Sequence, residues 1–301
     1  MKKNSEDHPI QGALFKALVR FFSWFSLGMQ QRIGAAIGWL LWRLPNSAKT
    51  VSAKNIEIAF PKLTQDAQAK LLKASLIETG KTFTELGAIW CWPQPKKLAL
   101  IQRVEGAEKL AEAVKLGKGV MVLSPHVGCW EIIGHYLAEH YPTSILYRPP
   151  RIGSLDAFMR QARESSGVRL QPTDMSGVKG LRRALKSGEV IGILPDQDPG
   201  KSGGVVAPFF EHPANSMVLV SKLLQKSQCP VFYSLAERLP QGEGYVIHLF
   251  EAPADLGATD EVIAAKALNQ GVEFCVRQVP EQYQWSYKRY KNLPKEYQKP
   301  Y

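Results

Sequence analysis

The sequence predicts an α/β fold, with a mostly parallel central sheet flanked by helices and an N-terminal helical segment that anchors the chain to a membrane. Three observations predict it. From about residue 100 onward, short apolar runs alternate with segments of roughly 10–15 residues that have helical periodicity. The first 45 residues instead combine apolar stripes with tryptophans and basic residues. The composition, 45% hydrophobic and 22% charged over 301 residues, is that of a globular chain.

Residues 1–45 have the features of a segment that lies in a membrane interface. One apolar stripe at helical spacing is formed by Leu14, Leu18, Phe21, Phe22 and Phe25. Three tryptophans, Trp24, Trp39 and Trp42, lie near basic residues, as in interfacial anchors. No window reaches the roughly 18 uninterrupted apolar residues of a clear spanning helix. We therefore expect a shallow or in-plane anchor; a spanning helix and a helix buried on the main domain are the alternatives.

Residues 46–95 are predicted to form a helical region, with a long helix over 64–90 that begins after Thr64 as N-cap. The segment Trp92-Pro93-Gln94-Pro95 ends this helix, and the α/β domain is placed at 96–301. Strands are predicted at 100–104, 119–124, 143–148, 190–195, 230–238 and 245–251. Helices are predicted at 107–116, 130–139, 154–165, 177–187, 215–226 and 260–278. The last two strands are expected to form an antiparallel hairpin at the sheet edge.

The formal charge of +11 is concentrated at the two ends of the chain. Residues 1–54 carry a net +6 and residues 277–301 a net +4, which leaves about +1 for the body. A nucleic-acid groove would place basic charge across the body, so the pattern indicates an anionic membrane surface or an acidic partner and no nucleic acid. A solvated basic surface without a partner is the simpler alternative. The four scattered cysteines indicate a reducing compartment and form no disulfide framework or zinc ribbon.

Residues 124–131, Ser-Pro-His-Val-Gly-Cys-Trp-Glu, form a predicted strand-to-helix turn. On one continuous helix His126 and Glu131 would point roughly 140° apart and could not cooperate. With His126 at the strand end and Glu131 in the first helical turn, Gly128 allows the chain to fold back, and we expect the two side chains to meet. A carboxylate bonded to one imidazole nitrogen leaves the other free to take a proton. The simpler interpretation is that both are capping residues.

Polar side chains also follow two further predicted strands, and the carboxyl ends of such strands are where open α/β sheets bind ligands. One strand ends in Arg148, and another ends in Asp196 and Asp198. An ion pair between Arg148 and either aspartate that only braces the loops is the structural alternative. The functional alternative is a D-x-D metal site of a membrane-associated glycosyltransferase, with the two aspartates on a divalent ion.

Other motifs in the sequence indicate a functional site less strongly. Ser202 lies in a G-x-S-x-G pattern, but no strand precedes it and no helix follows, as a nucleophile elbow requires. Cys129 is interpreted as a small semi-buried residue rather than a nucleophile. His126, Glu131 and His135 could hold a metal, although no H-E-x-x-H motif is present. A non-enzymatic membrane adaptor is a third interpretation of the whole chain.

Several segments together resemble the late (secondary) acyltransferases of lipid A biosynthesis, within the H-x4-D/E glycerolipid-type acyltransferases. His126 to Glu131 is similar to the H-x4-D/E motif. The other segments that carry the resemblance are Asn55-Ile56, Phe60-Pro61, Tyr147-Arg-Pro149, Leu194-Pro-Asp-Gln-Asp198, Ala207-Pro-Phe-Phe210 and Glu281-Gln-Tyr-Gln-Trp-Ser286 with Lys288-Arg289. They extend over nearly the whole chain.

The resemblance implies transfer of a fatty acyl chain from acyl carrier protein to a hydroxyl of a lipid A precursor, at the cytoplasmic face of the inner membrane. His126 and Glu131 would be the catalytic dyad, with His126 as general base. Arg163 falls where the family places a functional arginine, and Arg160 lies one turn away. Arg148, Asp196 and Asp198 would bind substrate or organise the arginines, and Arg163 or turn N–H groups would stabilise the oxyanion. Because a thioester is already activated, no metal or other cofactor is expected.

Overall fold

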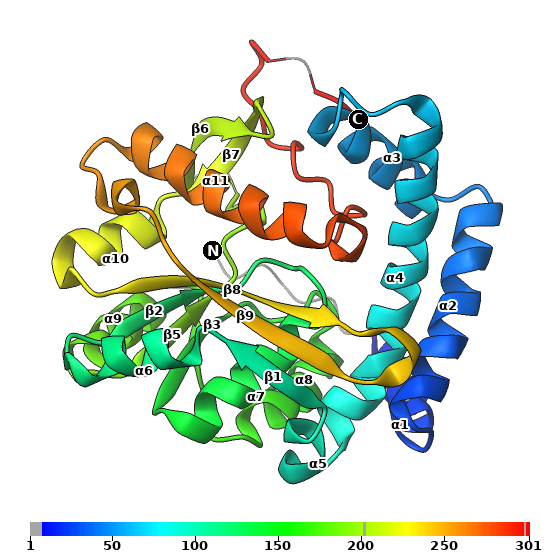
Figure 1. The fold of residues 1–301 in the computed structure, drawn as a ribbon, viewed down its shortest axis with the longest axis horizontal. Helices are drawn as coiled ribbons and strands as arrows, with labels where there is room; N and C mark the ends of the chain where they lie inside the picture. The colour runs from blue at the N-terminus through cyan, green and yellow to red at the C-terminus, as the bar shows by residue number, and fades with distance from the viewer. Residues whose placement is uncertain (1–7, 201–202, 298) are drawn as a thin grey trace.

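The computed structural model describes residues 8–200, 203–297 and 299–301, and within them a seven-stranded sheet forms the centre of the chain (Figure 1). The strands are β1 (Ile101–Glu105), β2 (Val120–Leu123), β3 (Thr143–Tyr147), β4 (Arg169–Pro172), β5 (Val190–Ile193), β8 (Val231–Arg238) and β9 (Tyr245–Glu251). Their spatial order is β1-β9-β8-β2-β5-β3-β4. Strands β8, β2, β5, β3 and β4 run parallel, and β9 is antiparallel to β8. The predicted α/β fold with a mostly parallel sheet is confirmed.

The three strands expected to deliver polar residues are neighbours in the sheet. Strand β5 lies between β2 and β3, and Leu123 at the end of β2 is in register with Ile193 at the end of β5. Because these strands are parallel, the segments that follow them leave the sheet at one edge. The fold therefore brings the turn after β2 and the loop after β5 side by side.

Three parts of the strand pattern differ from the prediction. The short strand β4 was not expected, and it forms one edge of the sheet. At the other edge, β1 pairs with β9, so the predicted hairpin of β8 and β9 does not form the edge itself. A separate two-stranded antiparallel sheet is formed by β6 (Gly204–Phe209) and β7 (His212–Met217). Residues 215–217, expected to begin a helix, therefore belong to β7. Pro208 and Pro213 lie opposite each other in this small sheet, and proline within a strand argues against a strand prediction.

Helices cover both faces of the central sheet. They are α6 (Ala107–Lys115), α7 (Trp130–His140), α8 (Asp156–Glu164), α9 (Met175–Lys186), α10 (Leu219–Ser227) and α11 (Glu261–Gln278), with short 3-10 turns η1 (Gly153–Leu155), η2 (Pro240–Gly242), η3 (Ala254–Gly257) and η4 (Pro280–Gln282). Helices α9, α10 and α11 pack on one face with Met121 and Leu123, and α6 and α7 pack on the other with Val120 and Val122. This alternation along β2 is the period of a strand buried on both faces.

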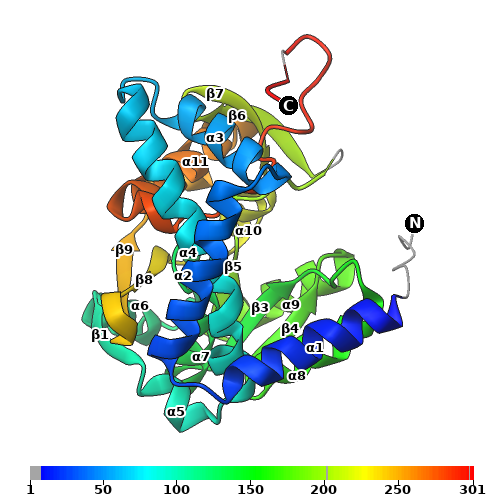
Figure 2. The ribbon, with the colours of Figure 1, turned by 90° about the vertical axis from the view of Figure 1, so that its right-hand side faces the viewer.

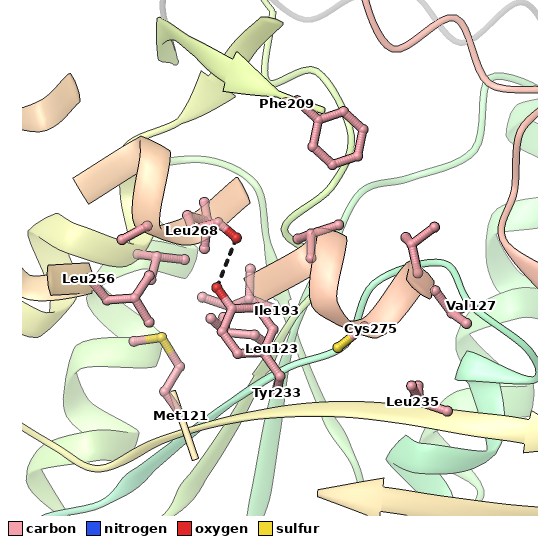
Figure 3. Packing of buried hydrophobic residues seen from close by; sticks show 14 of the residues in the cluster. Met121, Leu123, Val127, Ile193, Phe209, Tyr233, Leu235, Leu256, Leu268 and Cys275 are labelled. Carbon is pink, nitrogen blue, oxygen red and sulfur yellow. Dashed lines mark hydrogen bonds between the residues drawn. The ribbon is translucent and has the colours of Figure 1, made fainter. Parts of the chain in front are cut away.

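The core on the α11 side is shown in Figure 3. Met121, Leu123 and Ile193 of the sheet lie beneath Leu268 and Cys275 of α11. The buried hydroxyl of Tyr233 donates a hydrogen bond to the Leu268 carbonyl at 2.9 Å, so this polar group is paired within an otherwise apolar cluster.

In the part of the chain that the structure describes, five helices precede the sheet: α1 (Pro9–Ser23), α2 (Leu27–Arg43), α3 (Ser47–Ala59), α4 (Gln65–Cys91) and α5 (Gln94–Leu98). Helix α4 is the predicted long helix, and Thr64 caps it by accepting the Ala67 N–H. Helices α2 and α4 lie side by side (Figure 2), and a Cβ on Gly80 would come within 2.0 Å of the Gly34 carbonyl oxygen. Glycine at both positions allows this close approach of the two backbones.

The N-terminal helices also contribute to the cores of the sheet. Val19, Leu27 and Ile89 belong to the same buried cluster as α6 and α7. Arg238 of β8 and Glu85 of α4 form a buried ion pair, to which Tyr245 donates a further hydrogen bond at 2.9 Å. The domain boundaries predicted at residues 45 and 95 stay predictions. On both sides of each boundary, the chain contributes buried residues to the cores of the sheet.

Among the helices of the described residues, none combines the length and apolarity that crossing a membrane requires. The anchor predicted for residues 1–45 stays a prediction, and its residues 1–7, like Ser202, lie outside the described part of the chain. Several large apolar side chains of α1, of α2 and of the connection between them are exposed to solvent: Ile10, Leu14, Leu18, Phe21, Trp24, Met29, Trp39 and Leu40.

Candidate functional site

The turn after β2 is held tightly by its surroundings. Gly128 has φ +61°, and a Cβ there would lie 1.9 Å from the Ala236 carbonyl oxygen of β8. Its N–H donates to the Gln282 carbonyl at 3.0 Å, and Cys129 N–H donates to the Ala236 carbonyl at 2.9 Å. Glycine is needed here both for its left-handed backbone and for this close approach, as the sequence predicted for the fold-back of the chain. His126 is thereby placed rigidly at the strand end.

His126 is paired with Asp196, which follows β5. His126 Nδ1 lies 2.8 Å from Asp196 Oδ1, and the His126 backbone N–H donates to Asp196 Oδ2 at 3.2 Å. The Asp196 side chain is buried, and burial opposes its ionisation. The adjacent His126 and the hydrogen bonds it donates nevertheless lower the pKa of Asp196 below its ordinary value. An ionised Asp196 can only accept a hydrogen bond, so His126 Nδ1 carries the proton that it donates. The lone pair of the imidazole is therefore on Nε2.

The expected contact of Glu131 with His126 is corrected by the structure: Glu131 pairs with Arg163 of α8 instead. Arg163 Nε donates to Glu131 Oε2 at 2.9 Å, and its Nη2 donates to Oε1. Glu131 is in the first turn of α7, and this turn directs the carboxylate toward α8. Burial raises the pKa of Glu131, but the Arg163 charge and hydrogen bonds outweigh it, so the pKa lies below its ordinary value.

Arg160 lies outside this pair. Its Nη2 donates to Glu164 at 2.7 Å on the exposed side of α8. The guanidinium of Arg163, rather than that of Arg160, is therefore the one that faces the His126 turn. Both arginines lie over the buried ring of Tyr147, at 5.4 Å for Arg163 and 5.7 Å for Arg160.

Three residues beside the imidazole were not predicted as site residues. Gln197 Nε2 lies 3.2 Å from His126 Nε2 and donates to Gln284 Oε1 at 3.1 Å. Trp130 lies against the imidazole with its ring centroid 4.9 Å away. Gln197 and Gln284 are each within a segment that carries the family resemblance, and that position was the only sequence signal for them.

The C-terminal segment is joined to the turn after β2 by its backbone. Gln284 N–H donates to the His126 carbonyl at 3.0 Å, and Val127 and Tyr283 form a β-bridge. Asn55 of α3 donates to the carbonyls of Trp285 and Tyr287 at 2.7 and 2.8 Å. Sequence segments near residues 55, 126, 197 and 284 thus meet at one place.

Asp198 and Arg148 are not brought to His126. Asp198 is buried, and its Oδ1 accepts hydrogen bonds from Asn215 at 3.1 Å and Asn292 at 3.0 Å. Arg148 is exposed after β3, and Asp196 is committed to His126 rather than to Arg148. Because Asp196 and Asp198 have separate partners, the two carboxylates do not form one D-x-D face. Within the described residues no group of three metal-ligating side chains is arranged to hold an ion.

A small cavity adjoins the pair formed by Glu131 and Arg163. Its lining residues are Trp130, Glu131, Gly134, His135, Ile145, Leu146, Arg163, Val168 and Leu194. Its volume is about 50 Å³, far below the roughly 300–1,000 Å³ of an ordinary ligand pocket. A long apolar ligand can enter only if the walls move. Beneath it, burial and the nearby Lys97 lower the pKa of His135 to about 4, and Lys97 Nζ lies 3.2 Å from His135 Nδ1.

This arrangement suits proton transfer from a hydroxyl. A carboxylate-oriented imidazole whose basic nitrogen is the one not bonded to the carboxylate can take the proton of an attacking hydroxyl. The N–H groups of Val127, Gly128 and Cys129 are committed to backbone carbonyls. They are therefore not free to bind an oxyanion. Two of the five N–H groups of the Arg163 guanidinium donate to Glu131, and the other three make no hydrogen bond within the described residues, so they can act as donors.

Comparison with known proteins assigns the chain to a family. Residues 2–292 match the model of bacterial lipid A biosynthesis acyltransferases. The chain is 26% identical over 268 residues to the lipid A biosynthesis lauroyltransferase of Escherichia coli, covering 87% of this chain and 85% of that protein. It is 28% identical over 290 residues to the palmitoleoyltransferase of the same organism, covering 91% and 92%. A lipid A biosynthesis acyltransferase of Haemophilus influenzae is 28% identical over 271 residues, covering 88% and 85%. With its α/β fold and its His126–Asp196 site, the chain belongs to the bacterial lipid A biosynthesis acyltransferase family.

Proposed function

We propose that this protein transfers a fatty acyl chain from the thioester of acyl carrier protein to a hydroxyl of a lipid A precursor, with His126 as general base. The observation that carries the proposal is the His126–Asp196 pair, 2.8 Å between Nδ1 and Oδ1, at the carboxyl edge of the sheet. Family membership supports acyl transfer in lipid A synthesis. The glycosyltransferase alternative, which needs Asp196 and Asp198 on one metal ion, has no support from their geometry.

In the proposed reaction His126 Nε2 removes the proton of the acceptor hydroxyl as its oxygen attacks the thioester carbonyl carbon. Asp196 holds the Nδ1–H and stabilises the imidazolium that forms. The C–S bond then breaks, and the imidazolium returns the proton to the thiolate of the carrier. General-base assistance of this kind supplies about 10²–10⁴-fold in rate.

Glu131 and Arg163 have a supporting role in this proposal. Their ion pair forms a polar wall of the cavity that Trp130 also lines. The free N–H groups of Arg163 are donors for the negative charge on the carbonyl oxygen in the transition state. The apolar part of the same cavity, with Ile145, Leu146 and Val168, suits the start of an acyl chain.

The proposed partners follow from charge and exposed apolar surface. Acyl carrier protein is acidic and the acceptor bears phosphates, so the basic ends of the chain are complementary to both. The exposed apolar side chains of Leu14 in α1 and of Trp24, which follows α1, fit the interface of an anionic inner membrane, with the site at its cytoplasmic face. No metal or other cofactor is part of the proposal.

Acyl transfer by the purified protein tests the proposal directly. With acyl carrier protein loaded with a radiolabelled acyl chain and a lipid A precursor, the wild type should form acylated lipid. The His126→Gln variant should lose about 10²–10⁴-fold in kcat. Lys179→Gln, on the exposed face of α9, is the control and should keep full activity. Transfer that EDTA abolishes and that His126→Gln leaves intact would contradict the mechanism.

A further inference from the structure

The basic nitrogen of His126 is occupied in this structure. Asp196 takes the Nδ1–H, which leaves the Nε2 lone pair as the group that a general base uses. Gln197 Nε2 lies 3.2 Å from that nitrogen. An amide NH₂ group has two donors and no acceptor, so Gln197 donates to the lone pair. The amide therefore holds the position from which an acceptor hydroxyl would be deprotonated.

The orientation of the Gln197 amide is set by a second contact. Its other N–H donates to Gln284 Oε1 at 3.1 Å. With the amide reversed, the Gln197 oxygen would face the Gln284 oxygen, and the hydrogen bond to the imidazole would be lost. The Gln284 backbone is placed beside His126, because its N–H donates to the His126 carbonyl at 3.0 Å. The residue that bears the imidazole and the residue that accepts the second hydrogen bond are thus joined through their backbones.

The other approaches to the imidazole are also restricted. Trp130 covers the ring with its centroid at 4.9 Å, and the His126 side chain is 13% exposed. Gln197 is partly exposed in the loop after β5, so its side chain is the movable member of the group. A neutral amide hydrogen bond is readily exchanged for one from a hydroxyl.

We infer that Gln197 caps the catalytic base until the acceptor hydroxyl displaces it. Gln197 is then a positioning residue that reserves His126 for the acceptor and denies it to water; this rests on the proposed function. Without the cap, His126 Nε2 would take a proton from water as the water oxygen attacks the thioester carbonyl. The C–S bond would break, giving a fatty acid and the carrier thiol. The inference predicts that Gln197 sets the ratio of acyl transfer to thioester hydrolysis.

The test compares two rates for each full-length variant, using acyl carrier protein loaded with a fatty acyl chain. Thiol release without acceptor measures hydrolysis, and acylated lipid formed with acceptor measures transfer. Gln197→Ala should raise hydrolysis at least about tenfold, within the range of general-base assistance, and should still transfer the acyl chain. Gln284→Ala removes only the second contact of the amide and should raise hydrolysis less. Gln278→Ala, exposed on α11, is the matched control and should behave as wild type.

A double variant separates capping from general loosening of the site. If uncapped His126 activates water, the extra hydrolysis of Gln197→Ala should vanish in Gln197→Ala with His126→Gln. Hydrolysis unchanged in Gln197→Ala, or extra hydrolysis that persists in the double variant, overturns the inference while wild-type transfer remains. A wild type that transfers no acyl chain overturns the proposed function and the inference with it. Far-UV circular dichroism of each variant checks that the fold is retained.

Discussion

At the scale of single residues, the two buried carboxylates of the site have different partners and therefore different roles. Asp196 contacts His126 through both the ring and the backbone N–H, whereas Glu131 is bound by the Arg163 guanidinium. Both have a pKa below the ordinary value, so both are ionised at neutral pH. Only Asp196 is placed to select which nitrogen of the imidazole carries the proton.

Replacing these two carboxylates should separate their roles. Asp196→Asn presents a donor amide to His126 and favours the wrong imidazole tautomer, so kcat should fall by about 10²-fold or more while the fold is retained. Glu131→Gln removes one partner of a buried ion pair and should lower the free energy of unfolding by about 3 kcal/mol. Steady-state kinetics and urea unfolding measure the two effects. An Asp196→Asn enzyme with wild-type kcat would contradict the role assigned to Asp196.

His135 makes stability depend on pH. Its pKa in the folded chain is about 4, lowered mainly by burial, against about 6.5 when exposed. Between these values the unfolded chain binds the proton and the folded chain does not, so stability is full above about pH 6.5 and falls as pH decreases toward 4. About 2 kcal/mol from this group should be lost by pH 5. In urea unfolding at pH 7.5 and 5, His135→Gln should lose less stability than wild type, and an equal loss in both would contradict the assignment.

At the scale of elements, the predictions were most accurate where a segment has a strong period or a clear cap. The long helix α4 begins after Thr64 as expected, and β2 and β5 are the buried apolar runs seen in the sequence. Strand β4 has only four residues and a polar composition, which hides it from pattern reasoning. The β6–β7 sheet has a proline in each strand and is accommodated because it stands apart from the central sheet.

Two glycines, one on each side of β2 along the chain, offer a matched pair of variants. Gly117 and Gly128 both have positive φ, but a Cβ on Gly117 meets nothing within 4 Å, whereas one on Gly128 meets the Ala236 carbonyl. Gly117→Ala should cost about 1–2 kcal/mol of stability from backbone strain alone. Gly128→Ala should lower the free energy of unfolding by clearly more than Gly117→Ala does. It should also lower kcat, because the turn that places His126 must shift. Urea unfolding and acyl-transfer assays test this; equal effects of the two would contradict the role of close packing.

At the scale of the whole molecule, the N-terminal helices have both a buried and an exposed apolar side. Val19 and Leu27 are buried in the core, while Leu14 and Trp24 are 61% and 79% exposed. Arg20 and Lys16 lie on the same helix α1. A helix of this kind, attached rigidly to the catalytic domain, would hold the site at a fixed distance from a lipid surface.

Vesicle binding tests this proposed surface. Leu14→Ser with Trp24→Ser should weaken binding to vesicles of anionic phospholipid at least about tenfold, since each apolar side chain contributes roughly 1.5–3 kcal/mol when buried. Leu116→Ser removes a side chain that is 62% exposed at the end of α6 and should leave binding unchanged. Co-sedimentation with vesicles measures both. Equal binding by the wild type and the double variant would contradict a membrane role for α1.

The sequence by itself determined the α/β class, the order of most strands and helices, and the strand endings that bear His126, Arg148 and Asp196. These follow from local period, caps and turns, which depend on residues close together in the chain. The sequence by itself did not determine that Asp196, 70 residues away, is the partner of His126. Nor did it determine that Glu131 faces Arg163. That choice depends on β5 lying next to β2 and on α8 packing near α7. Only the tertiary structure decides it, because buried charges select partners by distance in space and not by spacing along the chain.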